Sequence, residues 1–263
     1  MSETNRPDSP RATFEAGKVY KVETICARAD AQSAEYALRL LKRKLEMVIA
    51  HHAEGLTLDL CCATGAHLLD LADFIRPAIG IDFSVPFVRK AADDAAAAGH
   101  SDLRFLVGDA KALPLTDGSI ATAYCFSSLY VIPDVHQVID ELARVLRPGG
   151  RAILDLGNAR SLNAYCVRHY PDLARQHFQT RGAMRKMVQN AGLAIVEQRA
   201  FQILPLWADR PGWLWPLLHP RWKRILATRV GGRMLDEWIS NLPFLRSLAF
   251  RQMIVCEKPV RKD

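Results

Sequence analysis

Apolar residues recur along the chain with two alternating periods. Between residues 31 and 50 they fall at helical intervals, which predicts an amphipathic helix: Tyr36, Leu40, Leu41, Leu45, Val48 and Ile49. Short apolar runs typical of buried strands follow at residues 56–61, 78–83, 103–109, 120–129, 151–157, 193–201 and 250–259, with helical patterns between them at 67–75, 85–99, 135–146 and 181–192. Strands that alternate with helices at this spacing predict an α/β fold, a doubly wound and mainly parallel sheet with helices on both faces.

Turn and cap residues support these boundaries. Ser84 is placed as an N-cap before the helix at 85–99, with Pro86 in its first turn and Gly99 at its end. The Pro148-Gly149-Gly150 run stops the helix that begins near residue 135.

The strand and helix rhythm breaks between residues 205 and 243. This segment holds all five tryptophans together with six basic residues: Arg210, Arg221, Lys223, Arg224, Arg229 and Arg233. We interpret it as an inserted, tryptophan-rich basic cap with a helix around 220–240, whose apolar side carries Trp222, Ile225, Leu226, Met234, Leu235 and Trp238. The predicted organisation is therefore a flexible N-terminus (1–30), a core with an N-terminal helix (31–204), the cap (205–243) and a last core strand (244–263). The N-terminal helix is expected to be either a lid or a dimer face.

Composition is that of a soluble globular protein, with 49% hydrophobic and 24% charged residues. The polar, proline-containing start is unlike a signal peptide, and no run approaches the ~20 apolar residues that span a bilayer. We therefore expect a cytoplasmic protein.

Charge is divided unevenly along the chain. Residues 151–263 contain 19 Lys and Arg against 8 Asp and Glu, a net charge of +11, whereas residues 1–150 contain 16 against 20, a net charge of −4. The basic half is either a solvated face or a surface for a negatively charged acceptor, a nucleic acid or a membrane.

The six cysteines lack the paired spacing of a zinc site, so we predict no metal. Adjacent Cys61 and Cys62 would point to different sides. Most of the cysteines are interpreted as small, buried apolar residues.

Three acidic residues stand in or at the end of the first three predicted strands: Asp59, Asp82 and Asp109. The turn after the first strand reads LDLCCATGAH, and Asp82 follows its Gly65 by 17 positions. An acid about 20 residues beyond such a turn usually accepts hydrogen bonds from ribose hydroxyls. Both NAD and S-adenosylmethionine contain such a ribose.

The residues of the turn separate these two cofactors. Cys61 and Ala63 stand where a dinucleotide site has glycines that let the backbone approach a pyrophosphate. S-adenosylmethionine has no phosphate and is cationic, which suits small side chains and nearby acids. Asp109 suits the adenine amino group, and Ala110 leaves room for the ring.

Four segments in order carry a family resemblance: LDLCCATGAHLLDLA, AIGIDFS, FLVGDAKALPLTDGSI and ELARVLRPGGRAIL. Together they resemble the class I S-adenosylmethionine-dependent methyltransferases, and most of all the small-molecule branch that includes the ubiquinone/menaquinone methyltransferases. The likeness covers roughly residues 55–157 and continues more weakly to 200 and in the last strand. It implies a Rossmann-like, seven-stranded sheet whose last strand is antiparallel.

The resemblance also implies roles for individual residues. Asp59, Ala63 and Gly65, with Cys61 in the first glycine's place, would line the methionine part of the cofactor; Asp82 and Phe83 would meet ribose and adenine, and Asp109 and Ala110 the adenine. Phe126 and Ser127 would cover its middle, although core packing is an equal alternative for Phe83 and Phe126. The chain departs from the family where GxGxG is CxAxG and where Ala121 replaces an acid, and the first departure bears on cofactor affinity.

Methyl transfer displaces a neutral sulfide, so alignment and water exclusion can carry it without an acid. A general base is needed only for some acceptors. The candidates at the strand ends are His67, Tyr130 and His136 for catalysis and, after the fifth strand, Asn158, Tyr165, Arg168 and His169 for acceptor binding. Each also has an ordinary structural interpretation.

We expect an enzyme that methylates a small or amphipathic acceptor at O, N or C, such as a secondary metabolite, quinone or glycan-lipid. The basic, tryptophan-rich cap suggests peripheral membrane contact. The alternatives are a nucleic-acid methyltransferase, supported only by the basic half, and a cofactor-binding protein that has lost catalysis.

Overall fold

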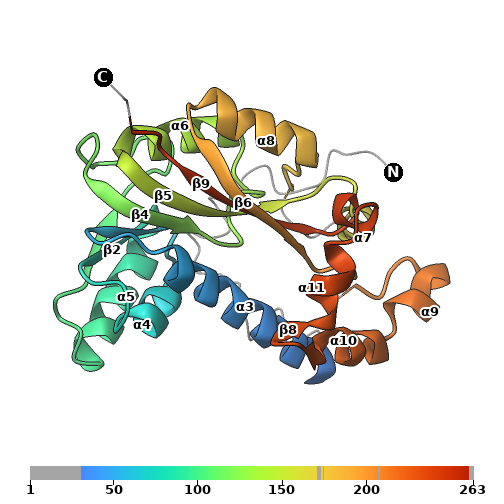
Figure 1. Ribbon diagram of the computed structural model, residues 1–263. Coiled ribbons are helices and arrows are strands. Elements are labelled where there is room, and N and C mark those ends of the chain that lie inside the picture. Colours follow the sequence, from blue (N-terminus) through green and yellow to red (C-terminus); the bar gives the residue numbers. More distant parts are fainter. Residues whose placement is uncertain (1–30, 171–172, 174, 207, 261–263) are drawn as a thin grey trace. The chain divides into compact units, whose positions relative to one another are not determined.

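The computed structural model describes residues 31–170, 173, 175–206 and 208–260. The predicted flexible N-terminus (1–30) and Trp207 lie outside these ranges. The helices are α3 (Ala31–His51), α4 (Ala66–Leu71), α5 (Val85–Ala97), α6 (Val135–Val145), α7 (Leu162–Val167), α8 (Arg181–Asn190), α9 (Trp215–Leu218), α10 (Pro220–Ala227) and α11 (Leu235–Ser240), with 3-10 turns η2 (Gly212–Leu214) and η3 (Leu245–Ser247). The strands are β1 (Thr57–Leu60), β2 (Ala78–Asp82), β3 (Arg104–Val107), β4 (Ile120–Cys125), β5 (Leu146–Gly157), β6 (Ala194–Phe201), β7 (Arg229–Val230), β8 (Arg233–Met234) and β9 (Arg251–Glu257) (Figure 1).

Seven strands form one sheet in the order β3-β2-β1-β4-β5-β9-β6. The pairs from β3 to β5 are parallel. Strand β9 runs antiparallel to β5, because the Gly149 N–H donates to the Lys258 carbonyl while the Asn158 N–H donates to that of Phe250. The prediction of a mainly parallel, seven-stranded sheet with an antiparallel last strand is confirmed. The strand order reverses between β1 and β4, and ligands of such sheets bind beyond the carboxyl ends of the strands at this point.

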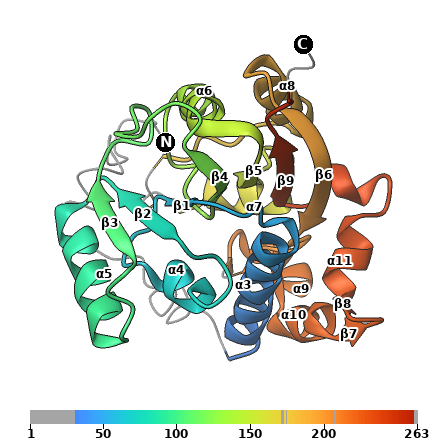
Figure 2. The ribbon, with the colours of Figure 1, turned by 60° about the vertical axis from the view of Figure 1, so that its left-hand side comes forward.

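The chain divides into two compact units. The first, named the sheet unit, comprises residues 45–155, 182–198 and 254–260. Within it α4 and α5 cover one face of the strands and α6 and α8 the other, as both ribbon views show (Figures 1 and 2). All residues of β1 and β4 are buried, because helices cover both faces of these central strands.

Helix α5 shows how local sequence sets an element of the sheet unit. It begins after Ser84, with Pro86 in its first turn, as predicted. The Ser84 hydroxyl makes no cap hydrogen bond; its backbone N–H donates instead to Oδ1 of Asp82 at 2.9 Å. The chain leaves the helix at Gly99, whose φ of +80° is in the left-handed region. Ser84 therefore precedes α5 and is held by the last residue of β2 through its backbone N–H.

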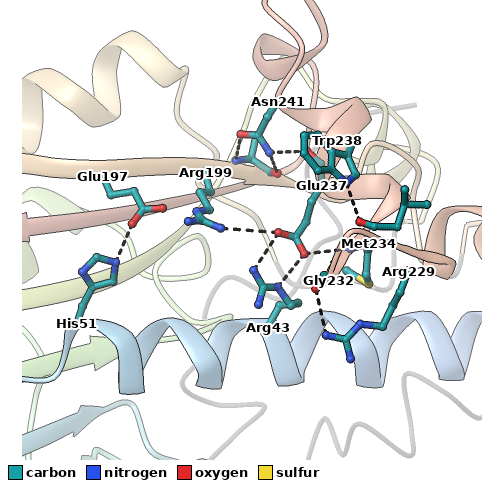
Figure 3. Close-up of polar contacts among 12 residues, drawn as sticks. Arg43, His51, Glu197, Arg199, Arg229, Gly232, Met234, Glu237, Trp238 and Asn241 are labelled. Atoms are coloured by element: carbon teal, nitrogen blue, oxygen red, sulfur yellow. Dashed lines mark hydrogen bonds and ion pairs between the residues drawn. The ribbon is translucent and has the colours of Figure 1, made fainter.

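The second unit, named the cap unit, comprises residues 31–44, the described residues of 156–181, and 199–253. Its N-terminal helix α3, predicted at 31–50, is confirmed. Arg43 on α3 donates from Nε to Oε1 of Glu237 at 2.7 Å and from Nη2 to Oε2 at 3.2 Å, and Arg199 of β6 lies 3.9 Å from Oε2 (Figure 3). Glu237 is buried in α11, so two arginines and an acid join three elements of this unit.

The predicted helix around 220–240 is wrong. Helix α10 ends at Ala227, a short antiparallel hairpin of β7 and β8 follows, and α11 begins at Leu235. Gly231 and Gly232 form the hairpin turn with φ of +57° and +79°, which the helical pattern around them concealed. The interruption also changes which side chains are buried: Leu226 and Met234 are inside, whereas Trp222, Ile225 and Trp238 are exposed. The predicted domain boundaries at 204 and 243 stay a prediction.

Candidate functional site

The loop after β1 bends three times through the left-handed region. Cys61 has a φ of +61°, Ala63 of +47° and Gly65 of +74°. These are the three positions of the glycine pattern recognised in the sequence. The loop therefore keeps the glycine conformation at two positions that are not glycine, at a steric cost of about 1–2 kcal/mol for each.

Of these three positions, only 65 must also be glycine because of the side chains packed against it. A Cβ there would lie 2.9 Å from Cε1 of Phe105 and 3.0 Å from Cβ of Ala91, both closer than van der Waals contact. Gly80 of β2 is equally confined, since its Cβ would lie 2.7 Å from Phe105. The first turn of α4 thus packs closely on β3 and α5. A left-handed backbone is tolerated with a side chain at 61 and 63, but there is no space for one at 65.

Asp82, at the end of β2, fixes this loop. Its Oδ2 accepts the Ala63 N–H at 3.0 Å, and its Oδ1 accepts the Ser84 N–H at 2.9 Å. Burial raises the pKa of the carboxyl, and the two N–H bonds partly offset the rise. Asp82 therefore holds the strained loop in place and also presents a carboxylate at the end of the strand, where the sequence places a ribose contact.

Asp59 lies beneath the loop rather than in it. It is buried in β1, and burial raises the pKa of its carboxyl well above the usual range; a nearby Tyr124 hydroxyl lowers it and Asp82 raises it further. The Tyr124 hydroxyl is close enough for this influence, but neither it nor Oδ2 of Asp59 completes a hydrogen bond with the described residues. An incompletely satisfied acid and phenol thus face each other below the loop, where methionine binding is predicted for Asp59.

Asp109 follows β3 and is exposed. Its Oδ1 accepts the Lys111 N–H at 2.9 Å, which turns the chain, and its Oδ2 makes no hydrogen bond with the described residues. Ala110, next to it, is half-buried. The pair thus offers an oriented acceptor oxygen beside a small side chain, the arrangement predicted for an adenine amino group and ring.

The aromatic candidates divide between surface and core. Phe83 is half-buried after β2, whereas Phe126 is buried after β4. The Phe126 ring meets those of His67 and Tyr124 at centroid distances of 5.8 and 5.3 Å. Core packing, one of the two interpretations of the sequence, accounts for Phe126. Ser127 is exposed with a φ of +60°, and its N–H donates to Oδ2 of Asp155 at 3.2 Å.

The catalytic candidates all lie in the sheet unit. His67, in the first turn of α4, is half-buried with its ring edge against Phe126. Tyr130 is half-buried after β4, and His136 is exposed in the first turn of α6. The structure brings His67 to the loop, and the catalytic roles of all three stay predictions.

Burial contributes to a raised thiol pKa at four cysteines: Cys62, Cys125, Cys166 and Cys256. A hydrogen bond with Cys61 raises the pKa of Cys125, and burial raises it further. Burial alone raises the pKa of Cys166 to about 11. Within the described residues, no group of three or more His, Cys, Asp or Glu side chains is arranged to hold a metal. In the loop, Cys62 is buried and Cys61 is half-buried.

The acceptor candidates belong to the cap unit, and Asn158 has a structural role there. Its side-chain amide donates to the carbonyls of Ser247 at 2.8 Å and Ala249 at 2.9 Å, and its oxygen accepts the Arg160 N–H at 3.1 Å. The side chain is fully buried. These bonds tie the end of β5 to the entry of β9, so the predicted acceptor contact of Asn158 is replaced by a structural one.

Aromatic rings surround the other candidates of the cap unit. Tyr165 meets His169 at 5.1 Å and Trp213 at 6.4 Å between ring centroids. Tyr170 donates to Oδ1 of Asp209 at 2.5 Å and accepts the Asp209 N–H at 2.7 Å, which joins the end of α7 to the tryptophan-bearing loop. Arg168, the residue after α7, is exposed. The structure thus joins Tyr165 and His169 with Trp213 in one aromatic wall.

Two residues of the site escaped the sequence reasoning. Tyr124 faces Asp59, and Asp155, fully buried in β5, accepts the N–H of Ser127. Asp155 had a usable signal, an acid inside an apolar strand, the same pattern that identified Asp59. Tyr124 had none, because an aromatic residue in a buried strand is ordinary core composition.

The strands and loops that carry this site form a segment shared with a known family. Residues 57–150 match the model of the methyltransferase domain family. The match spans β1 to the start of β5 and contains the left-handed loop and the three acids. Residues 57–150 are thus similar to methyltransferase domains.

Proteins similar to this chain include methyltransferases named for a quinone and for a sterol. The chain is 37% identical over 99 residues to a demethylmenaquinone methyltransferase of Lactococcus lactis, covering 36% of this chain and 39% of that protein. It is 31% identical over 150 residues to a sterol 4-C-methyltransferase of Caenorhabditis elegans, covering 55% of this chain and 44% of that protein. The chain therefore spans less than half the length of either relative.

A solved structure shares the fold beyond the domain. The geranyl diphosphate C-methyltransferase of Streptomyces coelicolor, solved with Mg²⁺, geranyl diphosphate and S-adenosylhomocysteine, superposes with a TM-score of 0.57 at 17% identity. The superposition covers 82% of this chain and 77% of that one. At this identity the likeness concerns the fold. Among the described residues, no helix has the length and apolar character to cross a bilayer.

Proposed function

We propose that the protein transfers a methyl group from S-adenosylmethionine to a small or amphipathic acceptor. The observation that carries the proposal is the loop of residues 61–65, which keeps three left-handed bends although two of its glycines are replaced. Strained backbone conformations of this kind occur mostly at functional sites, so the retained bends favour a working cofactor loop over an inactive protein.

The chemistry of the surrounding groups supports this cofactor over a dinucleotide. Asp82 presents a carboxylate where ribose hydroxyls are expected, and Asp109 an oriented oxygen where the adenine amino group is expected. The incompletely satisfied Asp59 lies below the loop on the side predicted for the methionine part. Acids around the site attract a sulfonium cation and repel a pyrophosphate. The relative solved with S-adenosylhomocysteine shares the fold that places these strand ends together.

When bound, S-adenosylmethionine supplies a methyl group on a positively charged sulfur that leaves as a neutral sulfide. The chain's own residues need to orient both reactants and exclude water, and no proton has to reach the leaving sulfur. His67, at the start of α4, is the proposed base for an acceptor that must lose a proton, with Tyr130 and His136 as the other candidates. Tyr165, Arg168 and His169 are proposed for the acceptor.

The acceptor is proposed to be a small or amphipathic molecule because the named relatives act on menaquinone precursors and sterols, and the cap unit presents aromatic walls. We place the protein in the cytoplasm, with a peripheral contact between the basic cap and a membrane. A quinone, a secondary metabolite and a glycan-lipid are the acceptor classes to be tested.

Titration calorimetry with S-adenosylhomocysteine tests the cofactor. We expect saturable binding and none with NAD. Asp109→Ala should weaken binding by about 1.5–3 kcal/mol, the worth of a hydrogen bond to a charged group, which is roughly 10- to 100-fold. Asp93→Ala, an exposed acid on α5, is the matched control and should bind like the wild type. Absence of binding to S-adenosylhomocysteine in the folded wild-type protein contradicts the proposal.

The acceptor is then sought by measuring cofactor consumption across phenols, quinones, glycan lipids and amines. Turnover with one of these classes and not with transfer RNA supports a small-molecule acceptor. Turnover with RNA alone contradicts it, although the cofactor assignment stands.

A further inference from the structure

The cap unit exposes large apolar side chains that a folded protein would normally bury. Trp213 is 71% exposed, and Trp215, Trp222, Ile225 and Trp238 are each between 44% and 47% exposed. On α10, Trp222 and Ile225 are exposed one turn apart, whereas Lys223, Leu226 and Ala227 are buried. We call this set the tryptophan surface: Trp213, Trp215, Trp222, Ile225, Val230 and Trp238.

Contacts within the segment hold two of these rings on neighbouring elements. Trp222 of α10 donates its indole N–H to the Pro216 carbonyl of α9 at 2.9 Å. Trp238 of α11 donates to the Val230 carbonyl of β7 at 3.1 Å, visible in Figure 3. Both rings are therefore held in place while exposed. Because their only polar group already has a protein partner, they can leave water without an unsatisfied N–H.

The exposed charged side chains between residues 211 and 244 are all basic. Arg221 and Arg224 are exposed on α10, and Arg229 and Arg233 on the hairpin. The guanidinium of Arg233 lies 5.3 Å from the centroid of the Trp238 ring. Between residues 210 and 244 the only acids are Asp236 and Glu237, and both are buried.

The two buried acids are also engaged inside the fold. Asp236 accepts the N–H groups of Gln202 and Ile203 at 2.6 and 3.0 Å. Glu237 accepts the bidentate guanidinium of Arg43. The outer side of the segment therefore carries arginines next to exposed aromatic rings, without acids to neutralise them.

From this combination we infer that the tryptophan surface and its arginines dock on a bilayer surface that contains anionic phospholipids. Tryptophan and isoleucine would enter the interface of head groups and acyl chains, and the arginines would meet the phosphates. Charge complementarity selects an anionic over a neutral bilayer. RNA would also meet the arginines, but the exposed set includes the aliphatic side chains Ile225 and Val230, which give a base no ring to stack on. The inference deepens the membrane contact included in the proposed function by naming the surface and the lipid.

Flotation of the full chain with vesicles tests it. We expect binding to phosphatidylcholine vesicles that contain phosphatidylglycerol, little binding to pure phosphatidylcholine vesicles, and a blue shift of tryptophan fluorescence on binding. Arg221→Gln and Arg224→Gln should each weaken partitioning about fivefold. Ile225→Ser should weaken it with the anionic lipid still present, because it removes apolar contact and no charge.

The matched controls are Arg89→Gln and Phe74→Ser, exposed positions of the sheet unit. Both should bind vesicles like the wild type. Calorimetry with S-adenosylhomocysteine on every variant reports whether the variant is folded. It also distinguishes the two proposals, since the arginine variants should bind lipid more weakly while they bind the cofactor analogue like the wild type.

Three results overturn the inference: no binding of the wild-type chain to anionic vesicles, equal binding by the arginine variants and the wild type, or equal loss in the controls. Salt-sensitive binding to transfer RNA without vesicle binding also overturns it and identifies the surface as an RNA contact. Loss of cofactor binding with intact vesicle binding would contradict the proposed function alone.

Discussion

At the scale of single residues, Ala63 is the sharpest test of strain in the loop. Its φ of +47° is costly for alanine and free for glycine. Ala63→Gly should raise the free energy of unfolding by about 0.5–1 kcal/mol, the relief of strain less the entropy that glycine adds to the unfolded chain. Urea denaturation measures it. Ala92→Gly, exposed within α5, is the control with the opposite sign and should lower stability by about 1 kcal/mol. Equal loss in both variants would show that the loop is not strained.

Asp59 makes stability depend on pH. Because burial raises the pKa of its carboxyl in the folded protein above the unfolded value of about 4, the folded state holds more protons between these two pKa values. Its contribution to the free energy of unfolding therefore falls as pH rises from about 4 through the raised folded pKa. Asp59→Asn should remove this fall and stabilise the protein at neutral pH, because the amide has no charged form that burial penalises.

Chemical denaturation at several pH values measures the difference between Asp59→Asn and the wild type. Asp93→Asn, exposed on α5, should give a curve parallel to the wild type. The comparison isolates Asp59, since Asp82 and Asp236, whose pKa values burial also raises, are present in both proteins. A constant difference at all pH values would mean that the pKa of Asp59 is the same in the folded and the unfolded protein.

The positions of the candidate acids were predictable at this scale because an acid stands out in an apolar strand pattern, and their roles stay predictions. Asp82 and Asp109 stand at strand ends in an otherwise apolar pattern, and the structure gives each an oriented carboxylate. Asn158 shows the limit: a polar residue after a strand has the same pattern whether it binds a ligand or the backbone. Two of its side-chain hydrogen bonds are made to Ser247 and Ala249, about 90 residues further along the chain, and the third to nearby Arg160. The sequence around Asn158 does not indicate the two distant partners.

At the scale of elements, the link between α3 and α11 depends on one buried acid. Arg43→Met leaves the buried Glu237 carboxylate with the Met234 N–H and the more distant Arg199, and should lower the free energy of unfolding by about 3 kcal/mol. Lys90→Met, which removes the exposed Lys90–Asp94 pair of α5, should cost about 1 kcal/mol or less. Equal effects on thermal or urea unfolding would contradict a structural role for the buried pair. Glu237→Gln in the Arg43→Met protein should restore part of the loss.

Elements with a clear apolar period in their own sequence were predictable. Elements whose ends are determined by a turn were less predictable. The apolar spacing of α3 and the runs of β1 and β2 are each visible within one segment, and all three were predicted within a few residues. The helix at 220–240 was wrong because apolar residues on α10 and α11 continue one helical period across the Gly231-Gly232 turn. Two adjacent glycines are a hairpin signal, and they should have outweighed that period.

At the scale of the whole molecule, the two proposals assign two ligands to different stretches of chain. The uneven charge of the sequence, −4 before residue 151 and +11 after it, matches this division. A cationic cofactor is proposed for a site made by the acids of the sheet unit, and an anionic bilayer for the arginines of the cap unit. Sequence alone predicted that the halves do different work, but it could not show that Asp236 and Glu237 are buried, which leaves Asp209 as the one exposed acid among the described residues of the cap.

Hydrogen exchange with each ligand measures this division directly. S-adenosylhomocysteine should slow amide exchange in residues 61–65 and 108–112, because a bound ligand excludes water from the loop and from the turn at Asp109. Vesicles with phosphatidylglycerol should instead slow exchange in residues 213–238. Arg221→Gln with Arg224→Gln should abolish the second pattern and keep the first, and Asp109→Ala the reverse. If the cofactor analogue protected mainly residues 213–238, the cap would be its binding site and the assignment of the acids at the strand ends would be wrong.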